Sequence, residues 1–214
     1  DIGNAGSAWI QKGGRTVVIA CGGDRFASSR LESLAEANGV TGVDLMILPR
    51  NTDTEAGAAR YVAQSIRVEH VVFPEFLQEA AFLSAEGYEV TKQGLYEPAP
   101  GLQVRFLHTQ NAVSAYADID GTTILFVFYP GCNSTEIPEE WKSVDILVCR
   151  AFPPSDLPLS GFGMIIVSSD DDVSEYIASE RGLEAFRVVS TAQKGNVLIN
   201  TRGGGVYSVG RDRT

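Results

Sequence analysis

The chain has 214 residues, 44% of them hydrophobic, and a mean hydropathy of zero, as expected for a globular domain with one sizeable core. Its 17 basic and 27 acidic residues give a net charge of −10, which argues against a protein that grips phosphate backbones over a broad basic surface. No stretch approaches the roughly 20 apolar residues that a membrane-spanning helix needs.

The first half of the chain alternates short apolar strands with helices. We expect strands at residues 16–20, 44–48 and 70–73, and helices at residues 30–38, 55–65 and 75–85. Gly39 and Gly87 stand as stops after the first and third helices. Thr52, Asp53 or Thr54 is the expected N-cap of the second helix.

The second half is richer in strands, which we expect at residues 102–107, 114–119, 122–129, 145–149, 164–168, 185–189, 197–200 and 206–209. Asp120-Gly121 is a strong hairpin signal, because glycine supplies the positive φ that a tight turn needs. A short helix or loop is expected at residues 138–142, and a helix at residues 174–182.

This order of elements favours a single domain, residues 1–214, with two mixed β-sheets packed face to face and helices outside, an α/β sandwich of four layers. A doubly wound parallel sheet is the alternative, but the Asp120-Gly121 hairpin and the β-rich tail count against it. The sequence begins at Asp1 inside what reads as structured sequence, so we expect a processed chain or a fragment of a larger protein.

The three cysteines, Cys21, Cys132 and Cys149, show none of the spacings typical of zinc ligands. Their odd number argues against a dense disulfide framework. Cys149 ends the apolar run VDILVC, which predicts a buried free thiol, although one pair of the three could be bridged.

Several short motifs follow one another along the whole chain. They are DIGNAGSA at 1–8, GGRTVVIACGG at 13–23, DLMILPRNTDTEAGA at 44–58, DILVCRAFPP at 145–154 and TAQKGNVLINTRG at 191–203. In order and spacing they resemble DVGQGDA, GGxTVLIDCGG, DLLILTHPDADHIGG, DVLKVGHHGS and TxxxGxIxIxTDG of one family. That family is the metallo-β-lactamase-like C-terminal domain of ComEC-type competence proteins, which are membrane proteins of DNA uptake. The resemblance implies a metallo-β-lactamase-like αββα sandwich.

Active members of that family use His and Asp side chains to bind one or two divalent metal ions, which activate a water for attack on a phosphodiester. Here Arg50 and Glu55 stand at two of the His positions, and Thr52 and Thr54 at two of the Asp positions. The metal-site positions that the resemblance marks as vacated are Arg50, Thr52, Asp53, Thr54, Glu55, Ala151 and Phe152. A guanidinium has no free lone pair for a metal, and a neutral hydroxyl is a poor substitute for a carboxylate.

The resemblance therefore implies a degenerate, metal-free domain without a cofactor or catalytic residues. Its role would be structural or regulatory in a membrane-anchored DNA-uptake protein, on the extracytoplasmic side of a bacterial membrane. Its partner would be the transmembrane channel part of that protein, with single-stranded DNA passing transiently through the complex. No basic DNA-binding patch and no small-molecule substrate are evident.

Two further hypotheses remain open. One is a divergent metal-dependent hydrolase, a nuclease or phosphodiesterase, which uses Asp and Glu ligands to hold Mn or Mg. The other is a vacated cleft that binds an anion or small ligand beside Arg50, with His108 close to it. The interpretation that we favour is internal replacement, in which Arg50 pairs with Glu55 or Asp53 where a metal and its ligands are lost together.

Overall fold

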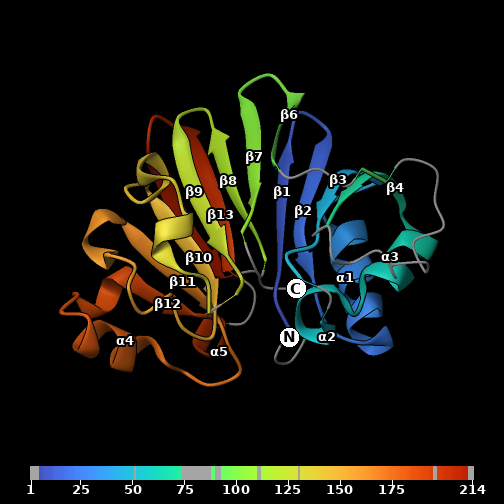
Figure 1. Ribbon diagram of the computed structural model, residues 1–214. Helices are drawn as coiled ribbons and strands as arrows, with labels where there is room; N and C mark the ends of the chain where they lie inside the picture. The colour runs from blue at the N-terminus through green and yellow to red at the C-terminus, as the bar shows by residue number, and fades with distance from the viewer. Residues whose placement is uncertain are drawn as a thin grey trace.

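The computed structural model describes residues 5–50, 52–73, 88–89, 93–109, 112–129, 131–194 and 197–211. Two large sheets face each other, and helices cover the outer side of each (Figure 1). The predicted four-layer arrangement of two mixed sheets flanked by helices is confirmed, and the alternative of one doubly wound parallel sheet is wrong. None of the helices in the described ranges is long and apolar enough to cross a membrane.

The first sheet has the strand order β1-β2-β3-β4-β5. Its strands are β1 (Ser7–Lys12), β2 (Arg15–Cys21), β3 (Gly42–Ile47), β4 (Arg67–Val72) and β5 (Tyr88–Glu89). The strands β1 and β2 are antiparallel and joined by Gly13 and Gly14, whose φ angles of 58° and 77° suit a tight hairpin turn. From β2 to β5 the strands run parallel. The helices of this half are α1 (Arg25–Ala37), α2 (Asp53–Ala56) and α3 (Ala59–Ser65).

The second sheet has the strand order β12-β11-β10-β9-β8-β7-β6. Its strands are β6 (Gln93–Ala99), β7 (Leu102–His108), β8 (Val113–Ile119), β9 (Thr122–Val127), β10 (Ile146–Arg150), β11 (Met164–Ser168) and β12 (Val188–Ser190). The strands β6 to β9 form an antiparallel meander, and β9 to β12 run parallel. A separate hairpin follows, with strands β13 (Val197–Gly203) and β14 (Val206–Arg211).

Short helices cover the outer side of the second sheet. They are α4 (Ser174–Glu180) and the 3₁₀ turns η2 (Ser134–Glu136), η3 (Glu139–Trp141), η4 (Leu159–Gly161) and η5 (Ala185–Arg187). The short helix α5 (Thr191–Lys194) directly follows β12 and borders the space between the sheets. The alternation of side chains along each strand divides the apolar residues between the two faces of a sheet. In β2, for example, Ile19 lies in the core between the sheets, whereas Val18 packs in the core under the helices. Because both of their faces are covered, the central strands β2, β3, β10 and β11 appear in the sequence as continuous apolar runs.

The structure corrects several predicted boundaries. The helix α1 begins at Arg25 rather than at residue 30, because the Asp24 carboxylate accepts hydrogen bonds from the backbone N–H groups of Phe26 and Ala27. The helix expected at residues 55–65 is divided into α2 and α3. At the break, a Cβ on Gly57 would lie 2.2 Å from the backbone oxygen of Gly23, so the chain there lies directly against the turn after β2.

Other expectations were incomplete. The strand expected at residues 185–189 is a 3₁₀ turn, η5, followed by β12, which begins at Val188. The edge strands β1 and β6 were missed, because their half-exposed residues do not form a continuous apolar run. The helix expected at residues 75–85 and the stop at Gly87 lie outside the described residues.

Candidate functional site

A buried ion pair joins the two halves of the sandwich at the predicted site. Arg150 Nε, at the end of β10, lies 2.9 Å from Glu55 Oε1, on α2. The Glu55 side chain is completely buried, and that of Arg150 is 21% exposed. The Nε–H and Oε1 are not aligned as a hydrogen bond, so the attraction is mainly between the two charges, which is strong away from water.

Threonine hydroxyls occupy the other side of the carboxylate. Thr54 Oγ1 donates a hydrogen bond of 2.6 Å to Glu55 Oε2, and Thr54 Oγ1 lies 3.0 Å from Thr52 Oγ1. Both carboxylate oxygens of Glu55 therefore have a polar neighbour, as a buried charge requires. Thr52 takes the N-cap position of α2, one of the three predicted, but its side chain makes no capping hydrogen bond.

Backbone contacts fix the loop that carries these residues. The N–H groups of Gly6 and Gly23 donate to the carbonyl oxygens of Thr54 and Asp53, at 3.0 and 2.6 Å. A Cβ on Gly22 would lie 1.9 Å from the Thr54 carbonyl oxygen, so only glycine fits there. This close approach directs Glu55 into the molecule and leaves the Asp53 side chain exposed.

Arg50 does not take part in the ion pair. Its guanidinium lies over the ring of Tyr129, which follows β9, with the guanidinium carbon 4.2 Å from the ring centroid. The predicted pairing of Arg50 with Glu55 or Asp53 is therefore wrong, because the cation that pairs with Glu55 is Arg150. Arg50 lies in the loop after β3, and its guanidinium stacks on Tyr129 after β9, whereas Glu55 on α2 faces Arg150 at the end of β10. One feature of the sequence points to Arg150: it directly precedes Ala151 and Phe152, which stand at the two later His positions of the family.

The remaining predicted site residues lie around this centre. Ala151 follows Arg150 with a φ of 58°, and its N–H donates to the Ser168 carbonyl oxygen at 2.9 Å. Phe152 is 42% exposed, and its ring meets that of Tyr176 on α4 edge to face, with centroids 5.9 Å apart. Phe152 therefore extends away from Glu55, towards the outer helix layer.

His108 ends β7, opposite Val113 of β8. The Val113 N–H donates to the carbonyl oxygen of Pro49 at 2.9 Å, so this end of β8 is joined to the loop after β3. The His108 ring lies 6.4 Å from that of Phe106, between centroids. His108 therefore lies at the end of β7, on the side of the sheet where β8 is joined to the loop after β3.

Comparisons with known proteins bear on the fold. No protein-family model matches the chain, and no curated protein matches its sequence. Among solved structures it is similar to the metallo-β-lactamase fold protein YhfI from Bacillus subtilis, with a TM-score of 0.60 and 12% identity over 87% of this chain and 88% of that one. It is also similar to a metallo-β-lactamase with a HARLDQ motif from Cronobacter sakazakii, with a TM-score of 0.52 and 15% identity over 69% and 74% of the two chains. The chain has a metallo-β-lactamase-like fold.

Identities this low show a shared architecture and leave the reaction open, because unrelated activities occur on one fold. Within the metallo-β-lactamase-like fold, α2, which follows the loop after β3, meets the end of β10 through Glu55 and Arg150. Among the described residues, no group of three or more His, Cys, Asp or Glu side chains is placed to hold a metal ion. Of the vacated positions that converge on the centre, Glu55 alone offers a carboxylate, and Arg150 already neutralises it. These residues do not fit a divalent metal centre.

The cysteines offer no nucleophile to this metallo-β-lactamase-like chain. All three are free and buried, which confirms the predicted free thiol at Cys149. Burial raises the pKa of Cys21 and that of Cys149 to about 12, so both remain neutral thiols at physiological pH. Burial also raises the pKa of Cys132, against a smaller opposing effect of the hydrogen bond with Ser114.

Proposed function

We propose that the chain is a metal-free, non-catalytic metallo-β-lactamase-like domain with a structural or regulatory role in a ComEC-type DNA-uptake membrane protein. The observation that carries the non-catalytic part is the buried Glu55–Arg150 ion pair. It occupies the convergence of two segments that would each supply metal ligands in an active relative. A positive side chain and a negative side chain stand there together, so the site has no net negative charge to attract a cation.

The donor chemistry supports the same conclusion. Arg50 and Arg150 have no lone pair for a metal, and their charges repel a cation. Thr52 and Thr54 are neutral, and Thr54 already donates to Glu55. A metal ion that entered would have to displace Arg150 from a completely buried carboxylate and leave that guanidinium without its counter-ion.

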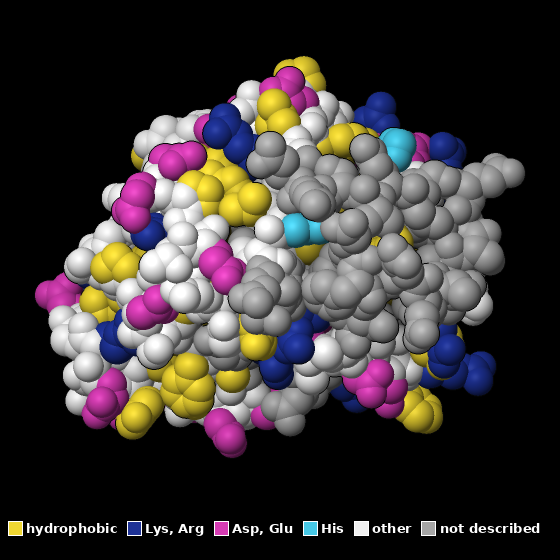
Figure 2. Space-filling model, viewed as in Figure 1, with side chains coloured by type: hydrophobic (Ala, Val, Ile, Leu, Met, Phe, Trp, Pro, Cys, Tyr) yellow, Lys and Arg dark blue, Asp and Glu magenta, His cyan; other side chains and the backbone are white. Residues whose placement is uncertain are grey.

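The surface charge supports a domain that acts through protein contacts. On the face shown in Figure 2, the described Asp and Glu side chains are interspersed with Lys and Arg, and basic side chains form no continuous stripe. The net charge of −10 agrees with this distribution. The ComEC-type context, the extracytoplasmic location and the transmembrane channel as a partner rest on the order of the sequence motifs.

Metal content tests the non-catalytic part. We would purify the chain without chelator, dialyse it against Zn, Mn and Mg in turn, and measure bound metal by mass spectrometry. We expect less than about a tenth of an equivalent of each metal. About one tightly held equivalent that is lost in Glu55→Gln would overturn the proposal and favour the divergent Mn- or Mg-dependent hydrolase, for which a nuclease assay would follow.

DNA binding tests the proposed role through protein contacts. We would titrate a fluorescently labelled 20-nucleotide single strand with the chain and follow its anisotropy at physiological salt. We expect no binding tighter than about 10⁻⁴ M, the weak end of non-specific binding. Micromolar binding that falls steeply with added salt would show direct contact with DNA, and the assigned role through protein contacts alone would be wrong.

A further inference from the structure

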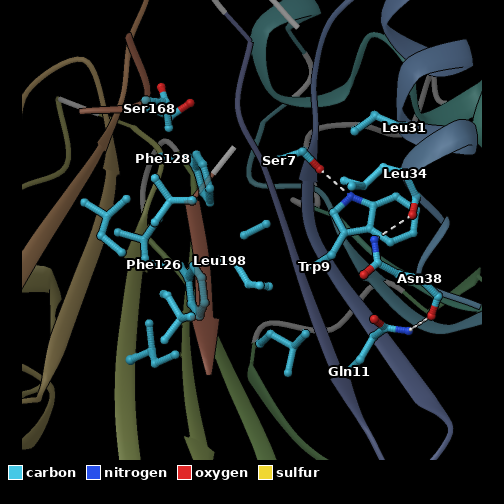
Figure 3. Close-up of a pocket in the computed structure, with 18 of the residues that line it drawn as sticks. Ser7, Trp9, Gln11, Leu31, Leu34, Asn38, Phe126, Phe128, Ser168 and Leu198 are labelled. Atoms are coloured by element: carbon cyan, nitrogen blue, oxygen red, sulfur yellow. Dashed lines mark hydrogen bonds between the residues drawn. The ribbon is translucent and has the colours of Figure 1, made fainter. Parts of the chain in front are cut away.

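A cavity of about 710 Å³ lies between the two sheets, beside the edge strand β1 (Figure 3). We call it the edge slot; it is lined by residues 7–11 of β1 and 197–201 of β13, by one side of α1 and by the inner face of the second sheet. Its volume is in the range of about 300–1,000 Å³ that is typical of binding sites. In Figure 3, Phe126, Phe128 and Leu198 lie across the edge slot from Trp9, Leu31 and Leu34.

The pattern of lining residues shows how each element borders the edge slot. The strand β9 and the residues after it contribute Ile124, Phe126 and Phe128, which are alternate residues. One face of that strand therefore forms the floor of the slot. The strands β1 and β13 instead contribute consecutive residues, 7–11 and 197–201. Consecutive side chains of a strand point to opposite faces, so these two strands border the slot with their edges.

These two edges are unpaired in the described part of the chain, where β1 pairs with β2 alone and β13 with β14 alone. The two-residue turn makes Lys12 and Arg15 the hydrogen-bonded pair that closes the first hairpin. In an antiparallel pair every second residue is hydrogen-bonded in this way, so the backbone N–H and C=O groups of Ile10 bond to Val17 of β2. The backbone N–H and C=O groups of Trp9 and Gln11 therefore point away from β2, into the edge slot.

An unpaired strand edge beside an apolar floor is the arrangement that accepts an added strand. We infer that the edge slot binds an extended peptide segment of a partner protein, which pairs with the backbone of Trp9 and Gln11. Alternate side chains of this peptide face the apolar side of the slot, where Leu198 is 44% exposed and covers the buried rings of Phe126 and Phe128. The other side chains face the polar groups of Gln11 and Asn38, at the rim.

Charge defines the peptide further. Among the described residues that line the edge slot, Asp170 is the one that carries a charge, and the full chain has a net charge of −10. An acidic peptide would meet repulsion there, whereas a peptide that alternates apolar and basic residues would be attracted. This binding activity is independent of whether the Glu55–Arg150 site is catalytic, because the slot does not include that ion pair.

The test uses the 214-residue chain and a synthetic heptapeptide, acetylated and amidated, in which lysine and valine alternate. Backbone hydrogen exchange of the isotope-labelled chain is followed by NMR. We expect the amides of Trp9 and Gln11 to exchange quickly in the free chain and at least tenfold more slowly with the peptide. Two control peptides, one with glutamate for lysine and one with methylated backbone nitrogens, should leave both rates unchanged.

A matched pair of variants tests the backbone contact from the side of the protein. Gln11→Pro removes an outward N–H at a sheet edge, where proline is tolerated, whereas Gln11→Ala keeps the N–H and removes the same side chain. We expect Gln11→Pro to weaken binding at least tenfold and Gln11→Ala to change it less than threefold.

Four outcomes would overturn the inference. Protection of Trp9 and Gln11 in the free chain would show that its own segments or a second copy already pair with β1, and sedimentation would separate these cases. Equal protection by the N-methylated peptide would indicate a site for apolar molecules in general. No protection at about 1 mM peptide, the weak end of measurable affinity, would exclude strand addition. Equal binding by both Gln11 variants would exclude the backbone contact.

Discussion

Removing the cation from the buried ion pair should destabilise the domain strongly. Arg150→Met keeps much of the side-chain volume and leaves Glu55, which is completely buried, without its counter-ion. Breaking a buried pair from one side costs about 3–5 kcal/mol, because the remaining charge has lost both water and partner. At about 2–4 °C per kcal/mol for a chain of this size, Tm should fall by roughly 10 °C.

The matched control is an exposed pair on the same molecule. Arg67 Nη2 lies 2.7 Å from Glu69 Oε1, a contact as short as that of the buried pair, but the two side chains are 78% and 34% exposed. Arg67→Met should therefore cost less than about 1 kcal/mol, because water already solvates both charges.

A double variant separates the loss of a contact from the burial of a lone charge. In Glu55→Leu with Arg150→Met, both charges are gone and apolar groups fill the space, so most of the lost stability should return. We would measure all variants by urea unfolding, followed by circular dichroism. The reasoning is refuted if Arg150→Met costs no more than Arg67→Met, or if the double variant is no more stable than Arg150→Met.

Three further predictions follow from other parts of the structure. Gly22→Ala should cost more than about 2 kcal/mol in urea unfolding, because the new Cβ would lie 1.9 Å from a backbone oxygen of α2, whereas Gly210→Ala, with open space around it, should change stability by less than about 0.5 kcal/mol. Burial raises the pKa of Cys149 to about 12, so the thiol of the unfolded chain loses its proton at lower pH than that of the folded chain. The free energy of unfolding should therefore fall as pH rises from about 9 to 12. Cys149→Ala should reduce the slope of unfolding free energy against pH by up to about 1.4 kcal/mol per pH unit. A double-mutant cycle of Arg50→Ala and Tyr129→Ala should give a coupling free energy of about 0.5–1 kcal/mol, and a value near zero would contradict the cation–π contact.

The local sequence determined the positions of most strands in the described ranges. Apolar runs such as those of β3, β10 and β11 are buried on both faces, so they stand out against the polar segments between them. The Asp120-Gly121 turn follows from local chemistry as well, with φ angles of 52° and 81° and a hydrogen bond from Gly121 N–H to the Asp118 carboxylate. The edge strand β1 was missed, because its partly exposed residues carry little periodic signal.

The sequence also determined that a complete ligand set is missing from the family positions, since the identity of each residue is enough to decide that. Only the tertiary structure decided that Arg150, and not Arg50, neutralises Glu55. Glu55 and Arg150 come from opposite halves of the chain, and the direction of each side chain depends on how α2 and β10 are oriented. The edge slot is likewise a property of packing, because it is bordered by one edge of the first sheet and one edge of the separate β13–β14 hairpin, which come together only in the folded chain.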